Sequence, residues 1–261
     1  MPGTRLRNLH TAGRGERKMM NVHKISFIEK AEAEINDEIL ERIWDYLSSL
    51  YKNGQILKNY ELIHNAEELF AYVTLPDDDA LKEDHNNLYV SKYRDQVLGH
   101  FLIESEAIGR NVNQDASCEC PDPSWYMLYT DYSLLESPVV CGDCGKAYPL
   151  YKLPHIRHHE HFDVLSWQKA YTSIDRLFLE CLSDRFTLRQ MRDPDSQLAQ
   201  IGREICKDFE EITGKPFYYY LFEYRKTRKT CPVCHSDWKL EGIKSFIDFK
   251  CEKCRLVADR V

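Results

Sequence analysis

Long apolar runs are missing from this chain of 261 residues. Although 43% of the residues are hydrophobic, no stretch approaches the ~18 consecutive apolar residues that a membrane-spanning helix needs. The N-terminal residues also lack the apolar segment of a secretory signal peptide. We therefore expect a cytoplasmic protein with no membrane partner, whose cysteines stay reduced and able to bind metal.

Known catalytic motifs are missing as well. The sequence contains no glycine-rich phosphate loop, no serine, histidine and carboxylate triad spacing, and no acid pair in a recognisable motif. These absences favour a binding protein over an enzyme. An enzyme with an unrecognised pocket remains a third alternative.

What the chain does have is cysteine in pairs: eight of its ten cysteines form four close pairs, which fall into two sets. The C-terminal set is Cys231, Cys234, Cys251 and Cys254, two CxxC pairs separated by sixteen residues. Two residues between cysteines let a tight turn aim both sulfurs at one ion, and a hairpin brings the second turn opposite the first. This spacing predicts a zinc ribbon.

The other set is Cys118, Cys120, Cys141 and Cys144, and it departs from that pattern because its leading pair is CxC. We expect zinc here too, with redox-active cysteines or disulfides as the alternatives. Four thiolates fill every position of a tetrahedral ion, whereas catalytic zinc keeps one position open for water. Both zinc ions would therefore be structural.

Charge is distributed unevenly along the chain. Residues 1–20 carry five Lys and Arg against one acidic residue, 21–213 carry nineteen against thirty-five, and 214–261 carry eleven against six. A polyanion would therefore bind at the C-terminal end, and a basic protein on the acidic body.

The first segment, 1–20, has no apolar periodicity, and we expect a disordered leader with the natural start at Met19 or Met20. The alternative is a basic arm that contacts nucleic acid.

Residues 21–112 predict an α+β domain with the order strand, helix, two strands, helix, strand, which is that of a ferredoxin-like split βαβ unit. The strands are expected over 22–29, 60–63, 69–75 and 100–108, and the helices over 37–53 and 77–99. This fold serves many functions, so it narrows the function little.

Residues 113–215 predict a segment held by the first cysteine set, followed by helices over 162–182 and 193–214. The aromatic run 125–132 is interpreted as strand and core packing, with base stacking as the alternative. The histidine-rich stretch 155–161 is interpreted as a polar surface turn, and the single cysteines Cys181 and Cys206 as small buried apolar residues.

Residues 216–261 predict the zinc ribbon. This segment begins with an aromatic strand and a basic run, which come before the first cysteine pair. Cations beside exposed rings suit single-stranded nucleic acid, because phosphates attract the charges and bases stack on the rings. The candidate contacts are Arg225, Lys226, Arg228, Lys229, Tyr219 and Trp238. In the alternative interpretation the rings are buried and the basic run is a linker, or the surface binds an acidic protein.

Five segments carry a resemblance to a known family. They are PSWYMLYT at 123–130, LESP at 135–138 with CGDC at 141–144, LSWQ at 165–168, FTLRQM at 186–191 and FKCEKCRL at 249–256. Together they resemble an uncharacterised bacterial family of zinc-ribbon-containing proteins with a suggested nucleic-acid-binding role. The resemblance runs from residue 22 to the end. It implies two cysteine clusters, a bacterial cytoplasm and a nucleic-acid role, and it brings no catalytic residue.

The sequence thus predicts an α+β protein with two structural zinc ions. Its leading function is that of an accessory factor that binds single-stranded RNA or DNA. The alternative is a protein-interaction adaptor, or an immunity-type protein, whose acidic body binds a basic partner.

Overall fold

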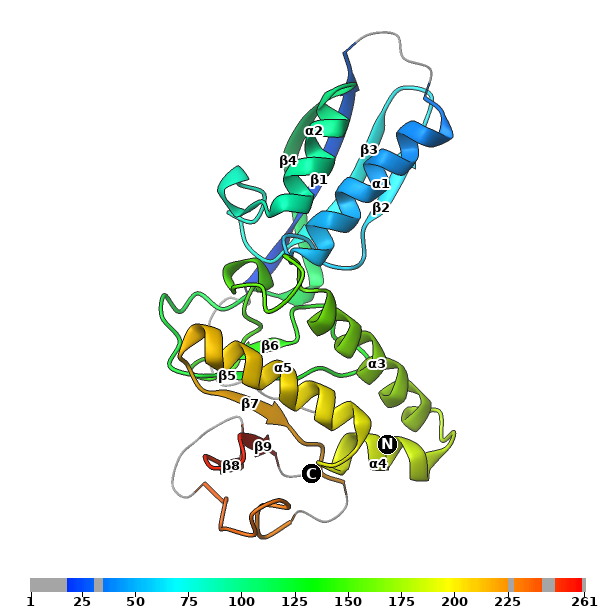
Figure 1. Ribbon diagram of the computed structural model, residues 1–261. Coiled ribbons are helices and arrows are strands. Elements are labelled where there is room, and N and C mark those ends of the chain that lie inside the picture. The colour runs from blue at the N-terminus through cyan, green and yellow to red at the C-terminus, as the bar shows by residue number, and fades with distance from the viewer. Residues whose placement is uncertain (1–17, 31–34, 225–227, 241–246, 260–261) are drawn as a thin grey trace.

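The computed structural model describes residues 18–30, 35–224, 228–240 and 247–259 (Figure 1). Over these ranges the protein is a mixed α+β molecule with two sheets, which confirms the predicted class. An N-terminal sheet with its two helices forms one end of an elongated molecule, and the cysteine-rich sheet lies toward the other end (Figure 1). None of the helices in these ranges is both long and apolar enough to cross a membrane.

The N-terminal sheet has the strand order β2-β3-β1-β4, with every neighbouring pair antiparallel. Its elements are β1 (Met19–Glu29), α1 (Asp37–Lys52), β2 (Glu61–His64), β3 (Leu69–Leu75), the short 3-10 helix η2 (Glu83–His85), α2 (Leu88–Leu98) and β4 (Phe101–Asp115). The predicted succession of strands and helices is therefore present. Asn36 caps α1, because its side chain accepts a hydrogen bond from the Ile39 amide.

The second helix begins later than the sequence predicted. The acidic run at Asp77–Asp79 forms turns, and α2 begins only after Asn87, whose side chain accepts from the Val90 amide. Three consecutive aspartates suit a first helical turn, but they also form turns readily through their own carboxylates. The Asp77 carboxylate accepts from the Asp79 amide in this way.

One face of this sheet is covered and the other is exposed. The covered face packs its apolar residues, such as Ile25 and Val73, under α1 residues such as Leu47. On the opposite face Ile28, Tyr72 and Leu102 remain 38–48% exposed. A sheet with one face in the core and one in solvent is a stable arrangement for antiparallel strands.

The second sheet has the order β6-β5-β7-β9-β8, with parallel pairs on both sides of β7 and antiparallel pairs at both edges. The elements of this half are β5 (Tyr126–Leu128), β6 (Val139–Cys141), η3 (Leu150–Lys152), α3 (Phe162–Leu179), α4 (Asp184–Arg192), α5 (Gln197–Thr213), β7 (Phe217–Tyr220), β8 (Phe249–Cys251) and β9 (Leu256–Ala258). The sheet joins strands from 113–215 with strands from 216–261.

The helices differ in part from expectation. The predicted helix 162–182 ends at Leu179, and the separate helix α4, which the sequence did not predict, follows a turn in which Cys181 has φ +55°. Cys181 is exposed rather than buried, while Cys206 is buried as expected. Helix α5 is capped by Ser196 and ends at Gly214, which has φ +69°.

Strand β7 lies at the centre of this half and is buried on both faces. Its four residues, Phe217 to Tyr220, are at most 1% exposed. Helix α5 can approach it closely because Gly202 has no side chain: a Cβ at that position would lie 2.3 Å from the Tyr219 ring. Tyr219 also makes an edge-to-face contact with Trp167 of α3.

The two halves meet at the histidine-rich stretch. The His161 amide donates to the Lys52 carbonyl at the end of α1, and the Asn87 side chain donates to the His159 carbonyl. His155 and His161 lie with ring centroids 4.6 Å apart. The interpretation of this stretch as a surface turn is correct for the exposed His158 and His159 but wrong for His161, which is fully buried.

Candidate metal centres

Both predicted cysteine sets are assembled. In each, the four sulfur atoms all lie within 4.8 Å of one another. Four sulfurs about 2.3 Å from a tetrahedral zinc ion are ~3.8 Å apart. The Sγ atoms of Cys118 and Cys144 are 3.4 Å apart, and those of Cys234 and Cys251 are 3.6 Å apart. The donor sets therefore fit zinc in number, chemistry and spacing.

The disulfide alternative is absent from this structure. All ten cysteines are free, and these sulfur separations are far longer than the ~2.05 Å of a disulfide bond. In the first set, hydrogen bonds with the thiols of Cys118 and Cys141 lower the pKa of Cys144. The thiolate is the form of cysteine that binds metal.

Three of the four cysteine pairs form the same turn. The residue that follows each of these CxxC pairs has a left-handed backbone: Gly145 at φ +73°, His235 at φ +59° and Arg255 at φ +52°. The amides of Gly145 and His235 donate to the carbonyls of Cys141 and Cys231 respectively, which closes each turn around its sulfurs. Non-glycine residues adopt this conformation at some cost.

The CxC pair is built differently. The Cys120 amide donates to the Cys118 sulfur at 3.3 Å, and the Cys118 amide donates to the Ala147 carbonyl. The sequence identified this departure from the zinc-ribbon spacing, and the geometry shows that it still delivers two sulfurs to the same site.

The two centres are linked by a stack of side chains. The Trp125 ring lies against Gly142 of the first centre, where a Cβ would approach it to 2.1 Å. Trp125 also contacts Tyr218 of β7 edge-to-face at 5.2 Å. The Lys250 ammonium, one residue before Cys251, lies 4.4 Å and 4.5 Å from these two ring centroids. The aromatic residues of 125–129 therefore pack the core between the two cysteine sites, as predicted, whereas Tyr132 of the same run is 44% exposed.

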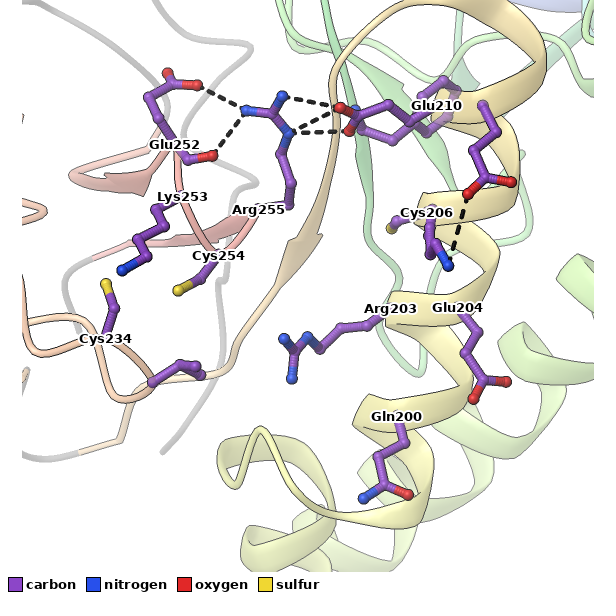
Figure 2. Close-up of a pocket in the computed structure, with 14 residues that line it drawn as sticks. Gln200, Arg203, Glu204, Cys206, Glu210, Cys234, Glu252, Lys253, Cys254 and Arg255 are labelled. Carbon is purple, nitrogen blue, oxygen red and sulfur yellow. Dashed lines mark hydrogen bonds and ion pairs between the residues drawn. The ribbon is translucent and has the colours of Figure 1, made fainter.

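Ion pairs join the last cysteine turn to α5 (Figure 2). The Arg255 guanidinium donates to both carboxylate oxygens of Glu210 and to Glu252. The hydrogen bonds from Arg255 lower the pKa of Glu210. These pairs lie at a cavity of about 990 Å³ between α5 and the C-terminal cysteine site, toward which Arg203 points from α5 (Figure 2). Lys253 lines the same cavity from the cysteine turn.

Two of the six predicted nucleic-acid contacts are buried. Tyr219 is 0% exposed and Trp238 is 2% exposed. The Trp238 indole donates to the Arg228 carbonyl, and its ring packs on Phe249 of β8. The expectation that these rings offer free faces for stacking bases is therefore wrong, because β7 is covered on both faces and Trp238 is buried against Phe249.

The predicted basic run is only partly described. Arg225 and Lys226 lie outside the described residues, and Lys229 is exposed. Arg228 donates to the Arg192 carbonyl, and both arginines flank the fully buried carboxylate of Glu223. Burial raises the pKa of Glu223, and the two arginines oppose that rise. The Arg228 charge is thus paired with a buried carboxylate of the core.

Two surfaces were missed by the sequence reasoning. On α4, Phe186 is 52% exposed between the exposed Arg185 and Arg189. On the open face of the N-terminal sheet, Glu104 and Glu106 are exposed on β4. The alternation of the two glutamates was a usable signal for an exposed strand face. The α4 surface had no comparable signal.

The chain matches three domain families and is similar to two proteins of Haemophilus influenzae. Residues 120–222 match the family described as "Domain of unknown function (DUF2310)", residues 223–260 match "Domain of unknown function (DUF8594)" and residues 20–108 match "Domain of unknown function (DUF8589)". An "Uncharacterized protein" of Haemophilus influenzae is 30% identical over 222 residues, which cover 79% of this chain and 85% of that protein. A second one is 32% identical over 163 residues, covering 59% and 80%.

Proposed function

We propose that this chain, which belongs to the family of these Haemophilus influenzae proteins, is a zinc-stabilised protein-interaction adaptor. Its acidic N-terminal sheet binds a basic protein partner. In this proposal each four-cysteine set holds one structural zinc ion, and the C-terminal set forms a zinc ribbon. The N-terminal domain is a ferredoxin-like platform that presents its open face. A chain without a recognised catalytic motif suits this binding role.

The observation that carries the proposal is an acidic groove of about 590 Å³ at one end of the open sheet face. Among the described residues that line it there is neither lysine nor arginine. Its five acidic residues are Glu29, Glu67, Glu68, Glu104 and Glu106. Of these, Glu68 forms an ion pair with Lys24 at 2.5 Å.

The charge of the whole domain supports the same conclusion. Residues 21–112 carry eighteen Asp and Glu against nine Lys and Arg. Such a surface repels phosphates and attracts lysine and arginine side chains, which speeds the encounter with a basic protein. The exposed Ile28 beside the groove adds apolar contact area.

The test compares the wild-type protein with a triple variant, Glu67→Lys, Glu104→Lys and Glu106→Lys, as bait in nuclease-treated lysate of its own host. We expect basic proteins to be captured by the wild type, to be released by salt and to be lost from the variant. The purified partner should then bind the wild type directly in calorimetry. Equal capture by both baits would exclude the acidic face as the binding surface.

Nucleic-acid binding is the second candidate, and one observation favours it. Phe186 is exposed between Arg185 and Arg189, and Arg228 lies at the end of α4, where its side chain donates to the Arg192 carbonyl at 2.7 Å. A ring between cations can stack a base while the cations hold phosphates. This surface would replace the buried rings of the original prediction.

The test for this candidate is binding of single-stranded RNA or DNA at several salt concentrations. Changing Arg185, Arg189 and Lys229 to Ala should weaken binding and flatten its salt dependence, whose slope is about −0.7 per phosphate contact. Phe186→Ala should cost about 1–3 kcal/mol and leave the slope unchanged. If wild-type protein shows no binding in the micromolar range at physiological salt, the candidate fails.

A further inference from the structure

The geometry points to the free edge of β4 as a site for β-strand addition, where a basic extended segment of the partner pairs with residues 104–110. This inference rests on the adaptor function and states how its acidic surface recognises a partner. In strand addition, main-chain hydrogen bonds supply affinity and alternate side chains supply specificity.

Strand β4 is an edge strand of the N-terminal sheet, whose order is β2-β3-β1-β4. It pairs with β1 over most of its 15 residues. Within the described part of the chain, no strand pairs with its outer edge. Such an edge presents a row of unpaired N–H and C=O groups, which is a template for another strand.

The middle of this strand is also exposed. All residues from Glu104 to Arg110 are exposed. Ser105 and Ala107 pair with Ile25 and His23 of β1, on the side of the sheet that carries the helices, and yet they are also exposed. The strand is thus accessible on both faces and along its outer edge, and an added strand would pair with that edge.

The side chains of β4 suit a basic segment. Glu104 and Glu106 pair with Ser26 and Lys24 and so lie on the open face, next to the exposed Leu102. An incoming strand that alternates cationic and apolar residues would place its cations opposite these glutamates. Cross-strand pairs of opposite charge each contribute roughly 0.2–1 kcal/mol.

The charges and register of β4 disfavour a second copy of this chain as the occupant. Antiparallel self-pairing about Ala107 would oppose Glu104 to Arg110. The register shift at Ile108 places Arg110 with Asn21, on the face opposite to Glu104, so the two charges cannot meet. Two acidic domains would also repel each other. Bulges and charges are the usual protection of an edge against self-association.

The probe is a synthetic peptide of alternating lysine and valine, titrated by fluorescence anisotropy against the full zinc-bound protein. Its matched control is the same peptide with N-methyl groups on the main-chain nitrogens of one edge, which keeps every charge but removes the donors. We expect the methylated peptide to bind at least about tenfold more weakly. Amide hydrogen exchange over residues 104–110 should slow with the first peptide only.

Two protein variants test the role of the charges. The double change Glu104→Gln and Glu106→Gln should weaken binding of the lysine–valine peptide roughly tenfold at low salt. The matched control, Glu41→Gln with Asp45→Asn, removes the same charge from exposed positions of α1 and should leave binding unchanged.

The outcomes separate this inference from the adaptor function. If both peptides bind equally, or if a partner captured in lysate leaves exchange at 104–110 unchanged, strand addition is overturned while the acidic surface keeps its function. If neither a peptide nor a partner binds in a charge-dependent way, the adaptor function itself fails. A dimer that protects the β4 amides without peptide would show that a second copy is the occupant.

Discussion

The two sheets of this protein reach stability by different means. The N-terminal sheet contains no cysteine, and its strands, most of them seven to fifteen residues long, share one apolar core with α1 and α2. In the second sheet β5, β6, β8 and β9 have three residues each. Its edge strands end in Cys141 and Cys251. Strands this short need additional cross-links, and the two four-cysteine sites stand at both edges, where a bound zinc ion would supply them.

The sheets also differ in what they leave exposed. The second sheet buries the aromatic strand β7 on both faces, so its rings hold the fold together and are not available to a ligand. The first sheet covers one face only, and its free face and free edge carry the acidic side chains. The second sheet, which is rich in aromatic residues and cysteine, therefore uses these residues to hold the fold together. The N-terminal sheet, which lacks cysteine, carries the accessible acidic surface.

The largest effect should follow from metal removal. Chelation, or Cys251→Ser, should unfold the cysteine-rich half, because zinc binding can supply on the order of 10 kcal/mol to so small a unit. Two zinc ions per chain should be released on complete chelation, as measured by mass spectrometry. The N-terminal sheet should keep its amide protection. Cys181→Ser is the control, since that exposed cysteine is in neither set. A metal-free protein that unfolds as cooperatively as the native one would contradict this difference between the sheets.

The next effect concerns acid and the junction between the halves. Burial and the neighbouring His155 lower the pKa of His161 to about 3. The unfolded state takes up this proton near pH 6.5, so the stabilisation is complete above that pH and is lost as the pH falls toward 3. Stability should decrease by about 1.4 kcal/mol per pH unit over this range.

The measurement is urea unfolding of the wild type and of His161→Phe at several pH values. The substitution leaves both four-cysteine sites unchanged, so the difference between the two curves isolates His161. Parallel curves would mean that His161 does not stay neutral in the folded protein.

A smaller loss of stability is expected where a glycine in tight packing is replaced than where a metal is removed, and a glycine in open space serves as its control. Gly202→Ala places a Cβ 2.3 Å from the Tyr219 ring and 2.8 Å from the Trp167 indole. Neither buried ring can move without disturbing the core, so the change should cost about 1–3 kcal/mol. Gly109→Ala in β4 is the matched control, because no atom lies within 4 Å of the added Cβ. Equal melting temperatures for both variants would show that the approach of α5 to β7 is looser than described.

The smallest effect should come from the acidic edge. Glu104→Gln with Glu106→Gln removes two exposed charges; Glu106 lies opposite Lys24 of β1, whose ion pair is with Glu68. The free energy of unfolding should stay within about 0.5 kcal/mol of the wild-type value. Any loss of partner binding in this variant would then report on recognition. A marked loss of stability would instead assign the two glutamates a structural role.

Much of the fold was predictable because local patterns decided it. The helix that begins after Asn36 and the strand 69–75 were read from periodicity and capping, and the structure reproduces them. The grouping of eight cysteines into two sets followed from spacing alone. Helix α4 was not predicted, because the predicted helices ended at 182 and began again at 193; the left-handed residues Cys181 and Ser183 separate α4 from α3.

The sequence by itself determined which cysteines can share an ion, because two residues between them fix the turn that aims both sulfurs at one point. It also determined the order of strands and helices in 21–112. Only the tertiary structure decided that Tyr219 and Trp238 are buried and that Arg228 neutralises Glu223. An aromatic strand has the same alternation whether one face or both are covered, and a basic run has the same charge whether it faces solvent or a buried carboxylate. Which applies depends on what distant segments pack against them.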